Sequence, residues 1–303
     1  MTTQPTDALL KALFEESAQI PLGFEMFPPK TPLGRADLLD AATRLAAIGP
    51  QSFSVTMGAG GTARRGTHET ALDIKQATSV PVTAHLTALG LDRETIAATA
   101  EGFWQDGITR ILALRGDAPK DADPAEIPHS YDHASGLVRA LREMHDFEIA
   151  VAAYPEKHPE AASLDSDIEH LKQKLDAGAS EAICQFVLNP EAYGRFLDAC
   201  AAHGVTAPIV PGVMPLDNWP RIRRFAVSTG ASVPPWLDRL FEGTGSSREL
   251  MHLTAMAATL EQVRRLVAYG APALHVYTLN RWEIPLAIAR MLGRTIGSAT
   301  PEA

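Results

Sequence analysis

The chain is poor in cysteine, with only Cys184 and Cys200 among its 303 residues. A disulfide framework needs more cysteines, and a tetrahedral zinc site needs clustered ligands, so neither is expected. No metal site is therefore predicted. Two free thiols indicate a reducing compartment, because disulfides persist only in oxidising ones.

Long hydrophobic runs are also missing. No stretch of about 18 apolar residues occurs, so no transmembrane helix is expected. The first residues, MTTQPTDALLKALFEES, lack the basic segment and the long apolar core of a signal peptide. We therefore expect a cytoplasmic protein with no membrane partner.

The chain has fewer positively than negatively charged residues: 27 Lys and Arg against 36 Asp and Glu, which gives a formal net charge of −9. This balance argues against nucleic acid or an anionic membrane as the main partner. The composition, 46% apolar and 21% charged, is ordinary for a folded globular protein. The length permits one large domain or two ordinary ones.

Short apolar runs alternate with amphipathic helical patterns along the chain. Most runs are apolar on both faces, which is typical of strands in a parallel sheet covered on both sides. The expected strands are 22–27, 51–56, 81–86, 108–114, 148–154, 181–187, 207–213 and 273–278. Eight such repeats in a chain of this length predict an α/β fold, a single-domain (β/α)8 TIM barrel, with a doubly wound sheet as the alternative.

The expected domain organisation follows from that barrel. The barrel is expected over residues 21–296, preceded by an N-terminal helix or tail over 1–20 and followed by a disordered tail over 297–303. An extra helix is expected over 247–269, before the last strand. No linker or shift in composition marks a second domain.

A glycine-rich segment from Gly58 to Ala63 fits the dinucleotide-binding pattern G-x-G-x-x-[GA] and follows an expected strand. We expect it to be a loop that does not open a helix, because Arg64-Arg65-Gly66 comes next. The acidic residue that the pattern needs about 20 positions later is also missing. The fingerprint is therefore rejected.

Polar or titratable side chains stand at the ends of seven of the eight expected strands. In a TIM barrel the carboxyl ends of the strands form the active-site face. We therefore expect a polar cavity at one mouth of the barrel. The side chains expected to line it are Glu25, Thr56, His85, Arg115 with Asp117, Tyr154, Gln185 and Tyr277.

The segment GFEMFPPKT, residues 23–31, places Glu25 between Phe24 and Met26 and then ends the strand with two prolines. We expect the apolar neighbours to desolvate the carboxyl, which disfavours its charged form and would suit a general acid. The alternative is that Glu25 pairs with Arg115 or caps a loop amide. The residues alone leave both open.

Eight segments carry a resemblance to a known family. In chain order they are FEMFPPKT, FSVTMGAGG, AHLT, ITRILALRGD, VAAYPEKHPEA, ICQFV, PIVPGVMP and HVYTLNR. Together they resemble the bacterial methylenetetrahydrofolate reductase family over roughly residues 20–295. The resemblance implies a (β/α)8 barrel that carries FAD at the strand ends. It also implies reduction of 5,10-methylenetetrahydrofolate to 5-methyltetrahydrofolate, with NADH as electron donor in a ping-pong reaction.

Two positions match the catalytic residues of that family, Glu25 and Asp117. The resemblance implies that Glu25 assists protonation of the folate N10, so that the five-membered ring opens to an iminium cation that accepts hydride from the flavin N5. An acid is needed because unassisted loss of an amine anion is prohibitive. The Asp117 carboxylate would stabilise the cation and bind the pterin amino edge.

Further positions match the ligand contacts of the family. Those that match FAD contacts are Thr56, His85, Arg115, Gly116, Asp117, Ala134, Tyr154, His158, Asp167 and Lys174. Those expected to hold folate or nicotinamide are Glu25, Gln185, Arg221, Phe225, Tyr277 and Arg281, with Phe225 also covering the flavin. Two positions depart from the enterobacterial members: Arg221 replaces a glutamine, and His133 replaces a tyrosine beside the FAD-contacting alanine.

Two alternatives remain within reach of the resemblance. One is a flavin-independent reductase with direct hydride transfer from NAD(P)H, and the other is a non-catalytic folate- or flavin-binding relative. Retention of Tyr154, His158, Asp167 and Lys174 favours the flavin-bound form, and the intact catalytic positions favour an enzyme. The resemblance also implies a homo-oligomer.

Overall fold

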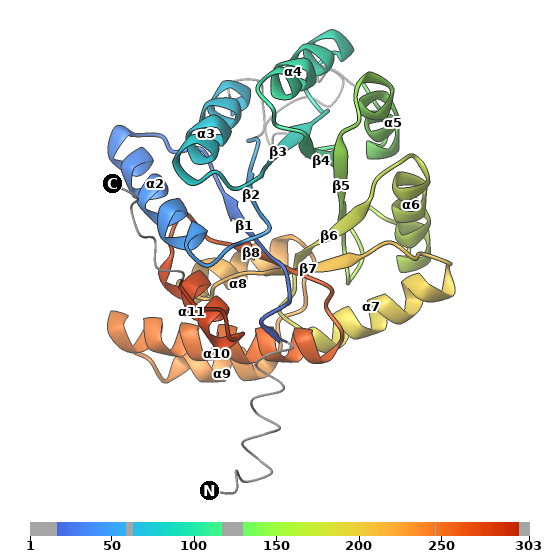
Figure 1. Cartoon of the computed structure of the whole chain (residues 1–303). Helices are drawn as coiled ribbons and strands as arrows, with labels where there is room; N and C mark the ends of the chain where they lie inside the picture. Colours follow the sequence, from blue (N-terminus) through green and yellow to red (C-terminus); the bar gives the residue numbers. More distant parts are fainter. Residues whose placement is uncertain (1–16, 59–62, 117–129, 246, 297–303) are drawn as a thin grey trace, which may run out of the picture.

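The computed structural model describes residues 17–58, 63–116, 130–245 and 247–296. Eight strands form a closed barrel in chain order, each parallel to its neighbours, and β8 closes the ring against β1 (Figure 1). The strands are β1 Leu22–Met26, β2 Ser52–Val55, β3 Val82–Thr87, β4 Arg110–Leu114, β5 Glu148–Ala153, β6 Glu181–Phe186, β7 Ile209–Val213 and β8 Leu274–Tyr277. The predicted TIM barrel is confirmed, and the doubly wound alternative is wrong because the sheet closes.

Helices follow the strands and surround the barrel. They are α2 Pro32–Ala46, α3 Ala63–Thr78, α4 Arg93–Gln105, α5 Ala134–Met144, α6 Leu164–Asp176, α7 Pro190–Ala202, α8 Trp219–Ser228, α9 Pro235–Glu242, α10 Arg248–Ala268 and α11 Glu283–Met291. Helix α10 confirms the extra helix expected before the last strand, whereas α9 was not predicted. The expected N-terminal helix and C-terminal tail lie almost wholly outside the described residues.

One local expectation is wrong. Helix α3 begins at Ala63, the last residue of the glycine-rich segment, although we expected no helix to open there. The single Gly66 costs only about 1 kcal/mol in a helix, and the surrounding arginine, glutamate and alanine residues favour one. The acidic residue required by a dinucleotide fingerprint is still missing, and the surrounding sheet is a closed barrel rather than an open one.

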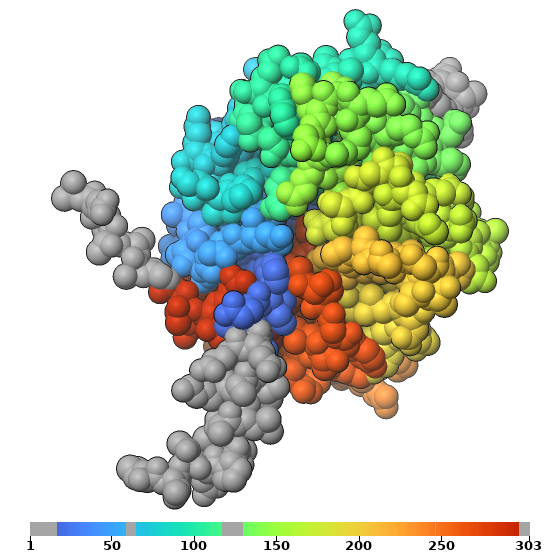
Figure 2. Space-filling view, turned by 45° about the vertical axis from the view of Figure 1, so that its right-hand side comes forward, coloured from blue at the N-terminus to red at the C-terminus, as the bar shows by residue number. Residues whose placement is uncertain are grey.

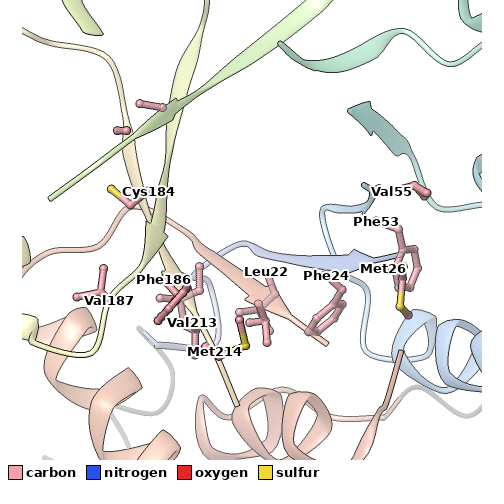
Figure 3. Packing of buried hydrophobic residues seen from close by; sticks show 14 of the residues in the cluster. Leu22, Phe24, Met26, Phe53, Val55, Cys184, Phe186, Val187, Val213 and Met214 are labelled. Atoms are coloured by element: carbon pink, nitrogen blue, oxygen red, sulfur yellow. The ribbon is translucent and has the colours of Figure 1, made fainter. Parts of the chain in front are cut away.

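Side chains on β1 alternate between the two faces of the barrel wall. Leu22, Phe24 and Met26 are fully buried, and Figure 3 shows them on the side of the strand that faces the outer helices. They join the hydrophobic core that fills the layer between strands and helices. Glu25 points the other way, into the barrel, because successive strand residues face opposite sides.

The longest connection between strands runs from β7 to β8 and carries α8, α9 and α10 on one side of the barrel (Figure 1). The Gln262 side chain of α10 donates its amide to the carbonyl of Val187, and Thr259 Oγ1 accepts the Leu216 amide at 3.3 Å. These bonds attach α10 to the carboxyl ends of β6 and β7. Elsewhere successive strand–helix units occupy successive sectors of the surface, as the colour sequence of Figure 2 shows.

None of the helices within the described residues is long and apolar enough to cross a membrane.

Candidate active site

The carboxyl of Glu25 lies inside the barrel between two histidines. Its Oε2 atom is 3.0 Å from His275 Nε2 and 3.6 Å from His85 Nε2. The side chains are 14%, 5% and 6% exposed for Glu25, His275 and His85 respectively. We call these three residues the lumen cluster. The expectation that Phe24 and Met26 desolvate Glu25 is wrong, since they lie on the other face of the strand.

The imidazole of His85 is held neutral. Burial lowers its pKa to about 4, with a further lowering from His275 and an opposing effect from Glu25. Within the described residues, neither His85 Nε2 nor the buried Ser54 Oγ has a hydrogen-bond partner. Ser54 is the neighbour of Glu25 in the β1–β2 register. Buried polar atoms without partners are rare, so these two suit a polar ligand at the barrel mouth.

Glu25 is fixed by the backbone of the segment that follows β8. The Glu25 carbonyl accepts hydrogen bonds from Thr278 N at 3.0 Å and Thr278 Oγ1 at 2.7 Å. The Asn280 side chain accepts from Phe27 N at 3.0 Å and donates to Phe27 O at 2.9 Å. Leu279 and Asn280 both have positive φ angles, 54° and 58°. The motif Y-T-L-N-R therefore makes a tight turn that joins the end of β1 to the end of β8.

The alternative that Glu25 pairs with Arg115 is wrong. Arg115 Nη2 instead donates to Glu160 Oε2 at 2.6 Å, and Arg115 Nε donates to the carbonyl of Gly116 at 3.3 Å. Within the described residues, the hydrogen-bond partner of the Glu25 carboxyl is His275, and His85 lies 3.6 Å away.

Tyr277 stands beside Glu25 in the register between β1 and β8. Burial raises the pKa of its phenol well above the usual range, and the nearby Glu25, Cys184 and Tyr154 raise it further. Its hydroxyl donates to the Cys184 carbonyl at 3.3 Å. The Tyr277 ring packs against Gly212, which has no side chain. A Cβ at position 212 would lie only 2.8 Å from the ring.

A pocket of about 300 Å³ opens between the ends of β4 and β5 and the helices α5 and α6. We call it the β4–β5 pocket. This volume lies at the lower end of the range for small-molecule sites. Its lining includes Arg115, Gly116, His133, Ala134, Tyr154, His158, Glu160, Asp167, His170 and Lys174.

The β4–β5 pocket combines the cationic side chains of Lys174 and Arg115 with the carboxylates of Asp167 and Glu160. Lys174 Nζ donates to the Ala152 carbonyl at 2.5 Å, and burial lowers its pKa to about 8 against an opposing effect from Asp167. Asp167 Oδ2 accepts the backbone amide of His158 at 2.7 Å. Lys174 and Arg115 are thus two cationic donors that could meet a diphosphate, the anionic part of the expected FAD.

Only glycine fits at position 116 in the wall of this pocket. Gly116 has a φ of +92°, and a Cβ built on it would lie 2.1 Å from Thr87 Cγ2. The backbone can therefore pass close to β3 while its own face toward the pocket stays free of a side chain.

Aromatic side chains form one part of the mouth. Phe225 of α8 is 45% exposed and stacks on Phe186 at a centroid distance of 5.3 Å. Gln185 and Tyr154 line a small recess next to it. Arg221 lies one helical turn before Phe225 and is exposed. Phe225 would be assigned to the core from its spacing alone, but the structure leaves its ring accessible.

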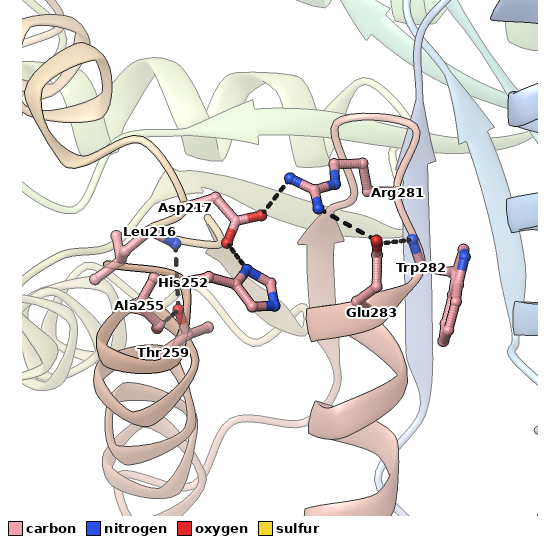
Figure 4. A network of polar contacts seen from close by, with 8 residues as sticks. All are labelled: Leu216, Asp217, His252, Ala255, Thr259, Arg281, Trp282 and Glu283. Carbon is pink, nitrogen blue, oxygen red and sulfur yellow. Dashed lines mark hydrogen bonds and ion pairs between the residues drawn. The ribbon is translucent and has the colours of Figure 1, made fainter. Parts of the chain in front are cut away.

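A polar network fixes Arg281 at the other side of the mouth (Figure 4). Arg281 donates to Asp217 Oδ2 at 3.0 Å and to Glu283 Oε1 at 3.2 Å. Asp217 Oδ1 also lies 2.8 Å from His252 Nδ1 of α10. Arg281 remains half-exposed, so its guanidinium is oriented by two carboxylates and still reachable by a ligand.

The predicted site residues do not all lie together in the structure. Seven residues expected to contact FAD line the β4–β5 pocket: Arg115, Gly116, Ala134, Tyr154, His158, Asp167 and Lys174. His85 belongs to the lumen cluster instead, and Thr56 is bound through its backbone amide to Met26 at 3.0 Å. The predicted catalytic Asp117 lies outside the described residues.

Sequence reasoning missed two residues that bond to Glu25, His275 and Thr278, and a third, Asn280, that bonds to the nearby Phe27. His275 was not singled out, although it stands two residues before Tyr277 and therefore faces the same side of β8. Thr278 and Asn280 belong to a motif that we noticed only as a resemblance. The alternation rule could have identified His275, but hydrogen bonds between loops cannot be derived from spacing.

Comparison with known proteins gives concordant matches along the chain. A family model described as methylenetetrahydrofolate reductase matches residues 10–293. The 5,10-methylenetetrahydrofolate reductases of Pectobacterium carotovorum subsp. carotovorum and Escherichia coli (strain K12) are each 38% identical over 287 residues, 95% of either chain. Methylenetetrahydrofolate reductase (NADH) 1 of Arabidopsis thaliana is 32% identical over 92% of this chain and 49% of its own.

Solved structures share the fold at low sequence identity. A Clostridium thermocellum protein that binds two copies of 5-methyl-5,6,7,8-tetrahydrofolic acid superposes with a TM-score of 0.62 at 14% identity, covering 94% of this chain and 98% of its own. A 2,3-dimethylmalate lyase superposes with a TM-score of 0.52 at 13% identity, covering 96% of this chain and 84% of its own. At such identity these matches support the barrel fold alone.

Proposed function

The chain belongs to the methylenetetrahydrofolate reductase family of oxidoreductases, and from this premise we propose that it reduces 5,10-methylenetetrahydrofolate to 5-methyltetrahydrofolate with FAD as cofactor and NADH as donor. In this role it serves one-carbon metabolism and supplies the methyl group for methionine. The observation that carries the proposal is the position of the β4–β5 pocket. Seven residues that match FAD contacts line it, and Tyr154 connects it to the barrel mouth where Glu25 lies.

The β4–β5 pocket is proposed to bind the non-reacting part of FAD. Arg115 and Lys174 supply positive charge for the diphosphate, and the bare backbone of Gly116 permits close approach. Lys174 is well suited to this role because an anion beside its buried ammonium would offset the cost of burying that charge. When bound, FAD supplies the hydride that it has accepted from NADH.

Glu25 is proposed as the general acid. The reaction consumes one proton for each hydride, and the proton goes to N10 of the folate as the bond from N10 to the bridging carbon breaks. His85 is neutral at pH 7 and therefore has no imidazolium proton to deliver. Glu25 is the member of the lumen cluster that matches the catalytic acid of the family. Asp117 is proposed to stabilise the cation that forms on the folate, in keeping with the resemblance.

The mouth residues are proposed to hold the two substrates in turn. Phe225 offers an accessible ring that can stack on a pterin or a nicotinamide and move aside between half-reactions. Gln185 and Tyr277 lie close to it, and Arg281 and Arg221 offer charge for the anionic ends of the substrates. The resemblance further supports a cytoplasmic homo-oligomer, whose subunit number light scattering on the purified protein would give.

The test is an anaerobic titration of the purified protein. We expect a yellow protein with flavin absorbance that NADH bleaches and that 5,10-methylenetetrahydrofolate restores. Both half-reactions should proceed separately, because the mechanism is ping-pong. A colourless protein that is fully active would support direct transfer from NAD(P)H and contradict the FAD assignment. A protein that binds folate or flavin but turns over neither substrate would support the non-catalytic alternative.

A further inference from the structure

Both histidines of the lumen cluster approach the same oxygen of Glu25. His275 Nε2 lies 3.0 Å and His85 Nε2 lies 3.6 Å from Oε2. Within the described residues, no hydrogen bond reaches the other oxygen, Oε1. The two oxygens of one carboxyl therefore have different environments, one facing the histidines and one free of them.

We propose that His275 is a positioning residue that donates its Nε2–H to Oε2 and thereby keeps the acidic proton of Glu25 on Oε1. The reason is the geometry of the carboxyl group. An oxygen that accepts from an N–H cannot also direct its own O–H along the same line, so the proton occupies the opposite oxygen. In the reverse arrangement Glu25 would donate its proton to His275, and that proton would not be available to the folate. The inference rests on the proposed role of Glu25 as the acid.

The surroundings of His275 support a fixed donor. Its ring is 5% exposed and packs edge-on against Tyr277 at a centroid distance of 5.3 Å. It stands on β8, whose backbone pairs with β1 on one side and β7 on the other. The titratable groups that face the pair are His85 from β3, Tyr277 from β8 and Glu181 from β6. A ring held on a paired strand cannot follow the substrate, so it can only orient Glu25.

The test compares His275→Leu with His275→Gln in the FAD-loaded protein. Leucine removes the donor, whereas the glutamine amide can still present an N–H toward Oε2. Reduction of the flavin by NADH should be unchanged within about twofold in both variants, which also shows that they fold. The folate half-reaction should slow about 10- to 100-fold in His275→Leu, the rate equivalent of one hydrogen bond to a charged group. It should stay within about fivefold of wild type in His275→Gln.

The pH profile separates positioning from a merely structural role. Loss of a hydrogen bond to a carboxylate favours the protonated acid, so the alkaline fall in the folate half-reaction should move to higher pH in His275→Leu. In His275→Gln that fall should stay where it is in the wild type. His145→Gln is the matched control, because it removes another histidine–glutamate pair, with Glu101 at 2.7 Å, far from the barrel lumen. His145→Gln should change neither the rate of the folate half-reaction nor its pH profile.

Two outcomes would overturn the inference. One is a wild-type rate and profile in His275→Leu. The other is an equal loss in both variants with no movement of the pH profile, which would make His275 a packing residue. Glu25→Gln is measured in parallel, and a normal folate half-reaction in that variant would instead refute the proposed acid and leave the orientation of the pair without a catalytic meaning.

Discussion

The lumen cluster and the β4–β5 pocket are neighbouring sites with opposite construction. The lumen cluster is built from side chains on β1, β3 and β8 that are at most 14% exposed, and its charges are few. The β4–β5 pocket is open, lies between helices and loops, and combines Arg115 and Lys174 with Asp167 and Glu160. The first is rigid because paired strands hold every member. The second depends on longer side chains and on loop backbone.

This difference matches the tasks proposed for the two sites. A proton must be delivered to one atom, which needs a carboxyl held in a fixed orientation. A dinucleotide must be bound along its length, which needs charge and space spread over several elements. Changes in the lumen cluster should therefore affect one chemical step, whereas changes in the β4–β5 pocket should affect stability and FAD affinity.

The largest effect on stability is expected from Gly116→Ala at the wall of the β4–β5 pocket. The new Cβ would lie 2.1 Å from Thr87 Cγ2 and the backbone would keep a φ of +92°. We expect a loss of about 2 to 4 kcal/mol in the free energy of unfolding, from overpacking and left-handed strain together. Urea denaturation measures it. Gly204→Ala is the control, since Gly204 has a φ of +76° and open space around it, so only the strain of about 1 to 2 kcal/mol should remain.

The next effect is expected from Lys174→Met in the same pocket. Loss of the buried ammonium should weaken FAD binding about 10- to 100-fold, as for one hydrogen bond between charged groups. Fluorescence titration of the apoprotein with FAD measures the dissociation constant. Lys172→Met, which removes an exposed ion pair with Asp176 on the same helix, should leave it unchanged. Equal weakening in both variants would mean that general charge, and not the pocket, holds the cofactor.

A smaller effect is expected at the turn that supports the lumen cluster. Asn280→Gly keeps the backbone freedom needed at a φ of 58° but removes both hydrogen bonds to Phe27. We expect a loss of about 1 to 2 kcal/mol in unfolding free energy, and a slower folate half-reaction with unchanged FAD affinity. Asn280→Ala should lose about 1 kcal/mol more because of backbone strain. Weaker FAD binding in Asn280→Gly would show that the two sites are not independent.

At neutral pH the smallest effect is expected from His85, because its contribution to stability changes only at acidic pH. Burial lowers its folded pKa to about 4 from an ordinary 6.5, so the unfolded chain binds more protons between these values. The free energy of unfolding should therefore fall as pH decreases from 6.5 to 4, and the contribution should be fully present above 6.5. His85→Gln should show a shallower fall in urea denaturation across this window. Parallel curves for the variant and the wild type would contradict a neutral, buried His85.

Much of this organisation could be predicted from the sequence. Every apolar run that we expected to be a strand forms one in the structure. Strands of a parallel sheet that is covered on both faces contain few polar residues, so they are easy to recognise in the sequence. The family resemblance is confirmed by the match over residues 10–293. Arg115 and Tyr154 of the β4–β5 pocket were expected from their places at strand ends, whereas the other FAD positions came from the resemblance. The role of all of them in binding FAD stays a prediction.

The environment of Glu25 could be predicted only in part, since we expected His85 in the same cavity but did not single out His275. We expected its sequence neighbours Phe24 and Met26 to surround it, but a strand sends adjacent side chains to opposite faces. Its real neighbours come from strands 60 and 250 residues away in the chain, at His85 and His275. Only closure of the barrel brings these positions together, and single-sequence patterns contain no register between strands.

A rapid-mixing comparison of wild type and Glu25→Gln shows whether Glu25 delivers the proton. We expect NADH to reduce the flavin at a similar rate in both proteins. Reoxidation by 5,10-methylenetetrahydrofolate should slow about 10²- to 10⁴-fold in the variant, the usual contribution of a general acid. An unchanged rate of reoxidation would show that the proton comes from another group and that Glu25 is not the acid.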